Sequence, residues 1–254
     1  MHHARKRFGQ HFLKDHNILT KIIVSIGLKN TDRVVEIGPG LGALTKELLT
    51  QLNHLDVLEL DRDLVLHLEK NFNPNQLTIY SVDALKFEFK TLSQKKHDLR
   101  IVGNLPYNIS TPLLFKLFDS LDYIQDMFFM LQKEVVLRLT AKPGEDHYGR
   151  LSVMSQYFCN NEYVFTVSPN AFDPPPKVYS AIVKLTPKKN QLQANNLTVF
   201  SDIVREAFNY RRKKLSNALK KYITSQQLIS LNINPESRPE MLTVDEFVKI
   251  SLLL

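Results

Sequence analysis

The feature that most constrains the fold is a glycine-rich turn after the first strand-like run. Residues 33–37 read Arg-Val-Val-Glu-Ile, as a short buried strand does, and Gly38, Gly40 and Gly42 follow directly. A helical apolar pattern then covers residues 43–52. Glycines at such a turn let the backbone bend sharply and let a ligand approach the main chain. The Gly-x-Gly-x-Gly spacing departs from the Gly-x-Gly-x-x-Gly of dinucleotide-binding folds, which disfavours a pyrophosphate ligand.

Strand-like and helical runs alternate along the chain. Asp15 caps a predicted helix that Gly27 ends. Further strands are predicted at 56–60, 77–80, 100–102 and 127–131, and further helices at 64–71, 112–117 and 133–140. Two β-rich segments, 162–167 and 178–185, are consistent with an edge hairpin around Asp173-Pro-Pro-Pro176. The alternation is typical of a Rossmann-like α/β fold, in which helices cover both faces of a parallel sheet.

The pattern changes after Pro187, where only helical runs remain. Helices are predicted at 198–222, 225–231 and 243–253. We therefore predict a ligand-binding α/β domain over residues 1–187 and a small helical domain over residues 188–254.

The cysteine content and the N-terminus narrow the classes of protein. A single cysteine, Cys159, cannot form an intramolecular disulfide, and no His or Cys cluster has metal-ligand spacing. The basic N-terminus leads into Phe8 and not into an apolar run, and no stretch approaches the roughly 18 apolar residues of a membrane span. We expect a cytoplasmic protein with no metal and no membrane segment.

The net charge of +7 is unevenly distributed. Residues 1–29 carry +5, residues 30–176 carry −5, and residues 177–221 carry +9. Clustered cations of this kind are typical of nucleic-acid binding, although a basic run alone is more often a solvated helix face. The expected RNA-binding residues are Arg5, Lys6, Arg7, Lys177, Arg211, Arg212, Lys213 and Lys214.

Acidic residues end the next two predicted strands. Glu59 ends the second strand, and an acid there can accept hydrogen bonds from a ribose hydroxyl pair. Asp83 follows the third strand, with Ala84 beside it, and can accept from an adenine amino group. Together with Gly38 and Gly40, these residues predict a nucleoside ligand such as S-adenosylmethionine. The glycines alone are equally consistent with an ordinary strand-to-helix turn.

Asn104-Leu-Pro-Tyr107 follows the fourth strand at the same edge of the sheet. The exocyclic amine of adenine is a poor nucleophile, because its lone pair is delocalised into the ring. The Asn104 side-chain oxygen and the Leu105 carbonyl could accept hydrogen bonds from that amine and aim its lone pair at a methyl donor. Tyr107 could stack on an extruded base. Taken alone, the four residues are also consistent with a capped turn before a helix.

Eight sequence blocks resemble a known family. They are Arg5-Lys-Arg-Phe-Gly-Gln-His-Phe-Leu13, Val35-Glu-Ile-Gly-Pro-Gly-Leu-Gly42, Leu58-Glu-Leu-Asp61, Asp83-Ala-Leu85, Gly103-Asn-Leu-Pro-Tyr-Asn-Ile-Ser110, Met130-Leu-Gln-Lys-Glu-Val135, Tyr148-Gly-Arg-Leu-Ser152 and Phe172-Asp-Pro-Pro-Pro-Lys-Val-Tyr-Ser180. In this order, over residues 4–186, the chain resembles the bacterial small-subunit rRNA adenine N6,N6-dimethyltransferases (the KsgA/RsmA family).

The resemblance implies a class I S-adenosylmethionine-dependent methyltransferase with a helical C-terminal domain. The enzyme would dimethylate two adjacent adenosines in the 3′-terminal helix loop of small-subunit rRNA, within a pre-30S particle, during ribosome biogenesis, and we expect a monomer. The resemblance also implies cofactor contacts by Gln10, His11, Leu13 and Asn104, and a second base-stacking face at Phe172. Family members commonly have Asn where this chain has His11.

Three alternatives stay open. The erythromycin-resistance type of large-subunit rRNA methyltransferase shares most motifs, although the blocks at 148–150 and 172–177 are less typical of it. A noncatalytic RNA-binding assembly factor could have kept the fold. A Rossmann dehydrogenase is disfavoured by the glycine spacing.

Overall fold

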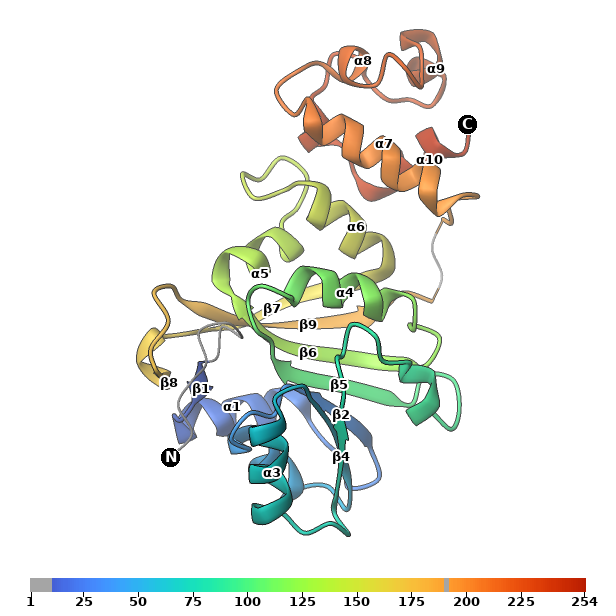
Figure 1. The fold of residues 1–254 in the computed structure, drawn as a ribbon. Coiled ribbons are helices and arrows are strands. Elements are labelled where there is room, and N and C mark those ends of the chain that lie inside the picture. Colours follow the sequence, from blue (N-terminus) through green and yellow to red (C-terminus); the bar gives the residue numbers. More distant parts are fainter. Residues whose placement is uncertain (1–10, 190–191) are drawn as a thin grey trace. The chain divides into compact units, whose positions relative to one another are not determined.

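The computed structural model describes residues 11–189 and 192–254 (Figure 1). The chain divides into two compact units. The first comprises Met1–Val136 and Glu162–Pro187, and the second comprises Leu137–Asn161 and Lys188–Leu254. One break therefore coincides with the boundary predicted near residue 187, but residues 137–161 group with the helical unit and not with the first domain.

A mixed sheet has the strand order β4-β3-β2-β5-β6-β9-β7 and belongs to the first unit, except that the first three residues of β7 fall in the second unit. Its strands are β2 (Arg33–Ile37), β3 (Leu55–Glu59), β4 (Leu77–Ser81), β5 (Leu99–Asn104), β6 (Ile124–Gln132), β7 (Cys159–Val167) and β9 (Ser180–Pro187). The strands from β4 to β6 pair in parallel, whereas β9 pairs antiparallel with β6. The five parallel strands predicted from the sequence are confirmed, with ends that differ by a few residues.

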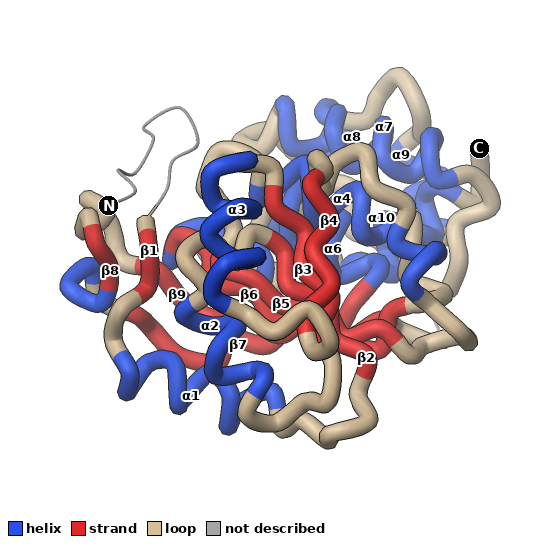
Figure 2. Tube along the Cα trace, turned by 60° about the horizontal axis from the view of Figure 1, so that its bottom comes forward, coloured by secondary structure: helices blue, strands red, loops and turns tan. Residues whose placement is uncertain are grey.

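A separate two-stranded sheet joins two distant parts of the first unit. Its strands, β1 (Phe12–Leu13) and β8 (Phe172–Asp173), pair antiparallel and lie side by side in Figure 2. Leu13 opposes Phe172 in this register. The proline-rich turn is thereby tied to the segment that precedes the first helix.

Helices connect the parallel strands. The connecting helices are α2 (Ala43–Leu49), α3 (Arg62–Asn71), the 3-10 helix η2 (Phe89–Leu92) and α4 (Ser110–Phe118). Helix α1 (His16–Ile26) precedes β2, α5 (Lys133–Thr140) follows β6 and runs across the break between the units, and η3 (Pro169–Ala171) precedes β8. The apolar residues of α1 and α2 pack on the sheet, where Leu19, Leu48 and Val102 are buried in one core cluster. As predicted, Asp15 caps α1 by accepting from the Asn17 and Ile18 amides.

A buried arginine fixes the end of α1 to the sheet. Arg100 donates to both carboxylate oxygens of Asp126 at 2.8 Å and to Asp32 at 2.8 Å. Its guanidinium also donates to the Ile26 carbonyl at 2.7 Å. Because this guanidinium is paired and hydrogen-bonded, its burial is tolerated, and it satisfies a carbonyl at the helix end that has no partner within the helix.

The second unit is helical. Its helices are α6 (Arg150–Phe158), α7 (Leu197–Asn209), α8 (Leu215–Ala218), α9 (Ser225–Ser230), α10 (Val244–Ser251) and the 3-10 helix η4 (Pro239–Met241). The Tyr157 ring lies 4.6 Å from the Phe200 ring, centroid to centroid, and the Tyr148 hydroxyl donates to the Leu242 carbonyl at 2.8 Å. These interactions explain why residues 137–161 belong to this unit.

The prediction of one helix over residues 198–222 is wrong. Helix α7 ends at Asn209, and the basic run 211–214 forms a turn in which the Lys213 amide donates to the Tyr210 carbonyl at 2.8 Å. The Leu215 amide, at the start of α8, then donates to the Ser237 carbonyl at 2.7 Å and not to a carbonyl of the preceding turn. Tertiary hydrogen bonds thus replace the helical ones that the sequence pattern predicts.

Candidate active site

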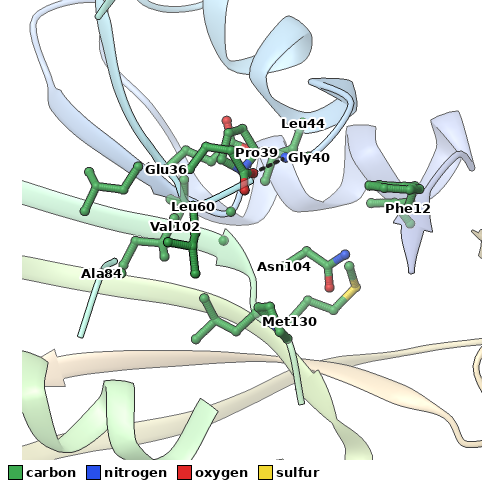
Figure 3. A pocket seen from close by; sticks show the side chains of 18 of the residues that line it. Phe12, Glu36, Pro39, Gly40, Leu44, Leu60, Ala84, Val102, Asn104 and Met130 are labelled. Atoms are coloured by element: carbon green, nitrogen blue, oxygen red, sulfur yellow. Dashed lines mark hydrogen bonds between the residues drawn. The ribbon is translucent and has the colours of Figure 1, made fainter. Parts of the chain in front are cut away.

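A cavity in the first unit lies at the carboxyl ends of β2, β3 and β5 (Figure 3). Ligands of open α/β sheets bind at this edge. The cavity brings together most of the predicted cofactor residues, namely His11, Leu13, Gly38, Gly40, Glu59, Asp83, Ala84 and Asn104, as well as Leu105 and Tyr107. Segments that are distant in sequence therefore form one site.

The glycine turn forms one wall of the cavity. Gly38, Gly40 and Gly42 all have positive φ angles, of 69°, 59° and 81°. A Cβ atom on Gly40 would lie 3.0 Å from the Phe12 ring, which packs against the turn. The turn therefore needs glycine at position 40 both for its backbone conformation and for the close approach of Phe12.

Two acidic side chains lie beneath this turn. Glu59, which is 7% exposed, accepts from the Gly40 amide at 3.3 Å and from the Asp61 amide at 2.9 Å, and burial raises its pKa. Glu36, which is 1% exposed, accepts from the Thr45 hydroxyl at 2.6 Å. Burial, and secondarily the nearby Glu59, raises the pKa of Glu36 to about 8. Glu36 therefore keeps its proton at neutral pH, so the two carboxyls are not both charged.

Asp83 follows β4 and lines the cavity beside the buried Ala84. One carboxylate oxygen of Asp83 accepts from the Leu85 amide at 3.0 Å. Its other oxygen makes no hydrogen bond within the described residues. The side chain is thus oriented by its own loop and keeps an acceptor for a ligand.

Asn104 is the last residue of β5, and its amide group is oriented by the segment before α1. Its Nδ2 donates to the main-chain carbonyl of His11 at 2.9 Å. Within residues 11–189 and 192–254, its Oδ1 has no hydrogen-bond partner. The Leu105 amide donates to the Met130 carbonyl at 3.2 Å, which holds the start of the following turn on β6. Asn104 therefore offers its acceptor oxygen at the cavity.

Tyr107 is held at both ends of its side chain. Its hydroxyl lies 2.8 Å from the Ser180 hydroxyl of β9, and burial raises its pKa, so the phenol is neutral. The His11 ring lies beside it, 5.8 Å away between centroids and tilted by 31°. His11 Nδ1 is 2.8 Å from the Pro174 carbonyl. The His11 side chain thus contacts Tyr107 and the proline-rich turn, while its main chain contacts Asn104.

Phe172 is not brought to the cavity. It is 1% exposed, packs in the apolar core with Leu13, and does not line the site. The structure therefore differs from the expectation of a second base-stacking face, because the short β1–β8 sheet places this ring in the core.

Two residues that the sequence reasoning did not single out shape the site. A Cβ atom on Gly103 would lie only 2.5 Å from the Ile37 carbonyl, so β2 and β5 approach too closely for any side chain. Ser180 holds the Tyr107 hydroxyl. Gly103 precedes Asn104 in the motif, which is the one signal that could have identified it.

The predicted basic residues have different surroundings. Arg5, Lys6 and Arg7 lie outside the described residues, as does Gln10, which the sequence analysis predicted as a cofactor contact. Lys177 is exposed on the segment between β8 and β9.

The run 211–214 is only partly available for a ligand. Arg211 pairs with Glu240 and donates to the Asp146 carbonyl at 2.8 Å, and Lys214 pairs with Glu236. Arg212 and Lys213 are exposed and make no ion pair with any described residue. Two cations of the four thus brace the turn, and two extend into solvent.

Within the described ranges, no helix is long and apolar enough to cross a membrane. The same residues contain no group of three or more His, Cys, Asp or Glu side chains that could hold a metal ion.

Comparison with known proteins identifies the family. The model of the family described as ribosomal RNA adenine dimethylase matches residues 1–254. The chain belongs to this family. This rRNA adenine dimethylase is 58% identical over 252 residues to the ribosomal RNA small subunit methyltransferase A of Coxiella burnetii (strain RSA 493 / Nine Mile phase I), with 98% of this chain and 97% of the relative covered. It is 53% identical to the protein of that name from Hahella chejuensis, with 98% and 92% covered.

Solved structures support the fold of the dimethylase. A dimethyladenosine transferase from Plasmodium falciparum matches with a TM-score of 0.80 at 30% identity, covering 94% of this chain and 96% of that one. The 23S rRNA methyltransferase ErmE matches with a TM-score of 0.74 at 22% identity, covering 94% and 97%, which shows the fold alone. The predictions of a Rossmann-like fold, rRNA adenine dimethylation and S-adenosylmethionine as methyl donor are confirmed.

Proposed function

We propose that this dimethylase modifies the N6 amines of two adjacent adenosines in the 3′-terminal helix loop of small-subunit rRNA, acting as a monomer on a pre-30S particle in the cytoplasm. The named relatives, small subunit methyltransferases at 53–58% identity, support the choice of the small subunit. The site geometry supports the chemistry.

The observation that carries the chemistry is the orientation of Asn104. Because the His11 carbonyl accepts from Nδ2 at 2.9 Å, the amide is oriented with Oδ1 as its available acceptor. In our proposal, Oδ1 and the Leu105 carbonyl each accept a hydrogen bond from one N–H of the adenine amine. These hydrogen bonds draw the nitrogen towards tetrahedral geometry and aim its lone pair at the methyl donor. Once methylated, the nitrogen is acidic and its proton passes to solvent, so the rate comes from positioning without a strong base.

Tyr107 would stack on the extruded adenine. Its hydroxyl is held at 2.8 Å by Ser180, so the ring is oriented before the base arrives. The neutral phenol leaves the pocket without an added negative charge. His11, beside the ring, supports it from the N-terminal segment.

The cavity fits S-adenosylmethionine in the chemistry of its donors and acceptors. Bound there, the cofactor supplies an electrophilic methyl group. Glu59 would accept from the ribose hydroxyls and Asp83 from the adenine amine of the cofactor, while the Gly38–Gly40 turn leaves the main chain accessible. Leu60, which is 52% exposed at the cavity, would cover an apolar face of the bound nucleoside.

The direct test is transfer of a radiolabelled methyl group to small-subunit particles that lack the modification, followed by mapping of the methylated nucleotides. We expect incorporation at two adjacent adenosines. No incorporation by the intact protein, or incorporation into large-subunit rRNA only, would contradict the proposal.

Asn104→Ala separates catalysis from binding. We expect this variant to lose methylation and to keep its affinity for the particle, because Asn104 is half-buried at the cavity and not on a basic surface. Loss of particle binding together with methylation would assign Asn104 a structural role. A wild-type protein that binds the particle but does not methylate it would favour the alternative of a noncatalytic assembly factor.

The second unit would supply part of the RNA-binding surface through Arg212 and Lys213. Reversing these two charges should weaken RNA binding and lower the salt dependence by a log-log slope of about 0.7–0.9 for each phosphate that is no longer neutralised. Cofactor affinity should not change. The matched control neutralises Glu236 and Glu240, which frees Lys214 and Arg211 and should not weaken binding. If the reversed variant and the wild type have equal RNA affinity, Arg212 and Lys213 are solvated surface residues that do not bind RNA.

A further inference from the structure

One exposed aromatic ring of the first unit has no role in the site described so far. Tyr179, in the connection between β8 and β9, is 55% exposed. Among the phenylalanine and tyrosine side chains described in the first unit, it is the only exposed one. Burying a tyrosine ring is favourable, so this exposed ring is a candidate contact for a ligand.

The backbone of Tyr179 is fixed one residue before Ser180, which contacts Tyr107 of the cavity. The Tyr179 carbonyl accepts from the Lys133 amide at 2.9 Å, directly after the end of β6. The next residue, Ser180, pairs with Gln132 and holds the Tyr107 hydroxyl at 2.8 Å. Adjacent Cα atoms are about 3.8 Å apart, so the base of the Tyr179 side chain lies one residue from the group that orients Tyr107.

The residues that precede Tyr179 in the chain are apolar and cationic, and both are exposed. Val178, which is 45% exposed, precedes it, and the exposed Lys177 precedes Val178. An exposed ring with a neighbouring cation is the combination that binds unpaired nucleotides, with the ring under a base and the cation at the backbone.

We propose that the Tyr179 ring is a stacking platform for the unpaired nucleotide next to the adenosine held by Tyr107. This inference rests on the proposed function. A target base that leaves its stack exposes the face of its neighbour, and a second aromatic ring at the rim restores that stacking. When two adjacent adenosines are modified, each in turn is the target while the other is the neighbour. Tyr179 would thus position the RNA and select an unpaired purine beside the target.

The test compares Tyr179→Ala with Tyr179→Phe, which keeps the ring, and with Val178→Ala as the matched control on the same segment. For Tyr179→Ala we expect KM for the particle to rise about tenfold, a typical loss for one base–aromatic stack. We expect kcat and the affinity for S-adenosylhomocysteine to stay within twofold. Tyr179→Phe and Val178→Ala should stay within twofold of the wild type in every measurement.

A spectroscopic measurement isolates the stacking itself. An RNA hairpin of the 3′-terminal loop carries 2-aminopurine beside the target adenosine, and stacking on a tyrosine ring changes its fluorescence on binding. We expect this change with the wild type and Tyr179→Phe, and its loss with Tyr179→Ala at saturating protein.

Three results would overturn the inference. They are an unchanged KM and fluorescence for Tyr179→Ala, a Phe variant as weak as the Ala variant, or an equal loss of S-adenosylhomocysteine affinity in Tyr179→Ala. A wild-type protein that does not methylate the particle would overturn the proposed function instead, so the two failures are distinguishable.

Discussion

Gly103→Ala is expected to damage the site through the sheet beneath it. The new Cβ atom would lie 2.5 Å from the Ile37 carbonyl oxygen and 3.1 Å from the Leu105 side chain. The first distance is about 1 Å shorter than an optimal one, and its partner is backbone in the neighbouring strand, which cannot rotate away. Either β5 moves away from β2 or the clash remains strained.

We expect this overpacking to reduce the free energy of unfolding by about 2–3 kcal/mol. For a domain of this size that corresponds to a fall in Tm of about 5–10 °C. Asn104 follows Gly103 directly, so a shift of β5 also displaces its amide from the His11 carbonyl. A displacement of about 1 Å of a positioning group typically costs about a hundredfold in rate.

The assay combines calorimetric melting with methyl transfer measured well below the Tm of the variant. Gly149→Ala is the control, because its Cβ would meet no atom within 4 Å and its φ of −166° is extended backbone. We expect the control to lose less than about 1 kcal/mol and to keep full activity. A Gly103→Ala protein with wild-type Tm and wild-type rate would refute the reasoning.

Three further expectations concern buried groups. Burial raises the pKa of folded Glu36 from its ordinary value of 4.5 to about 8, so the free energy of unfolding should fall as pH rises between those values, by at most about 1.4 kcal/mol per pH unit. In urea unfolding between pH 5 and 8, Glu36→Gln should show a smaller fall than the wild type, and the same dependence on pH in both proteins would contradict this expectation. Arg100→Met leaves Asp126 buried without its partner and should cost about 3–5 kcal/mol in thermal unfolding, so a loss under about 1 kcal/mol would show that the pair is dispensable. Burial raises the pKa of Cys159 to about 12, so mass spectrometry should find it unlabelled by a thiol reagent at pH 8 until denaturant is added, whereas rapid labelling of the native protein would disprove its protection.

The sequence was informative wherever the chemistry is local to a strand end. Glu59, Asp83 and Asn104 come at or just after three successive predicted strands, and parallel strands bring such residues to the same edge. The structure gathers all three at one cavity. Local capping was equally readable, since Asp15 and Gly27 end α1 as predicted.

The sequence was less informative where contacts with distant segments decide the conformation or position of a residue. The pattern around residues 211–214 is compatible with a helix, but in the structure main-chain hydrogen bonds to Tyr210 and to the distant Ser237 form a turn there. The Phe172 pattern does not distinguish a ring in the core from a ring at a cavity, and only the pairing of β1 with β8 decides between them.

The composition of the helical unit from two separate stretches of chain has a consequence for synthesis. Helix α6 is complete when residue 158 leaves the ribosome, but the ring that covers Tyr157, at Phe200, and the carbonyl that pairs with Tyr148, at Leu242, are made later. The apolar side of residues 148–158 must therefore wait for the C-terminal end of the chain. A nascent chain released at Pro187 would hold the cavity residues but expose this apolar surface, so premature termination should yield an aggregation-prone fragment and not a working catalytic half.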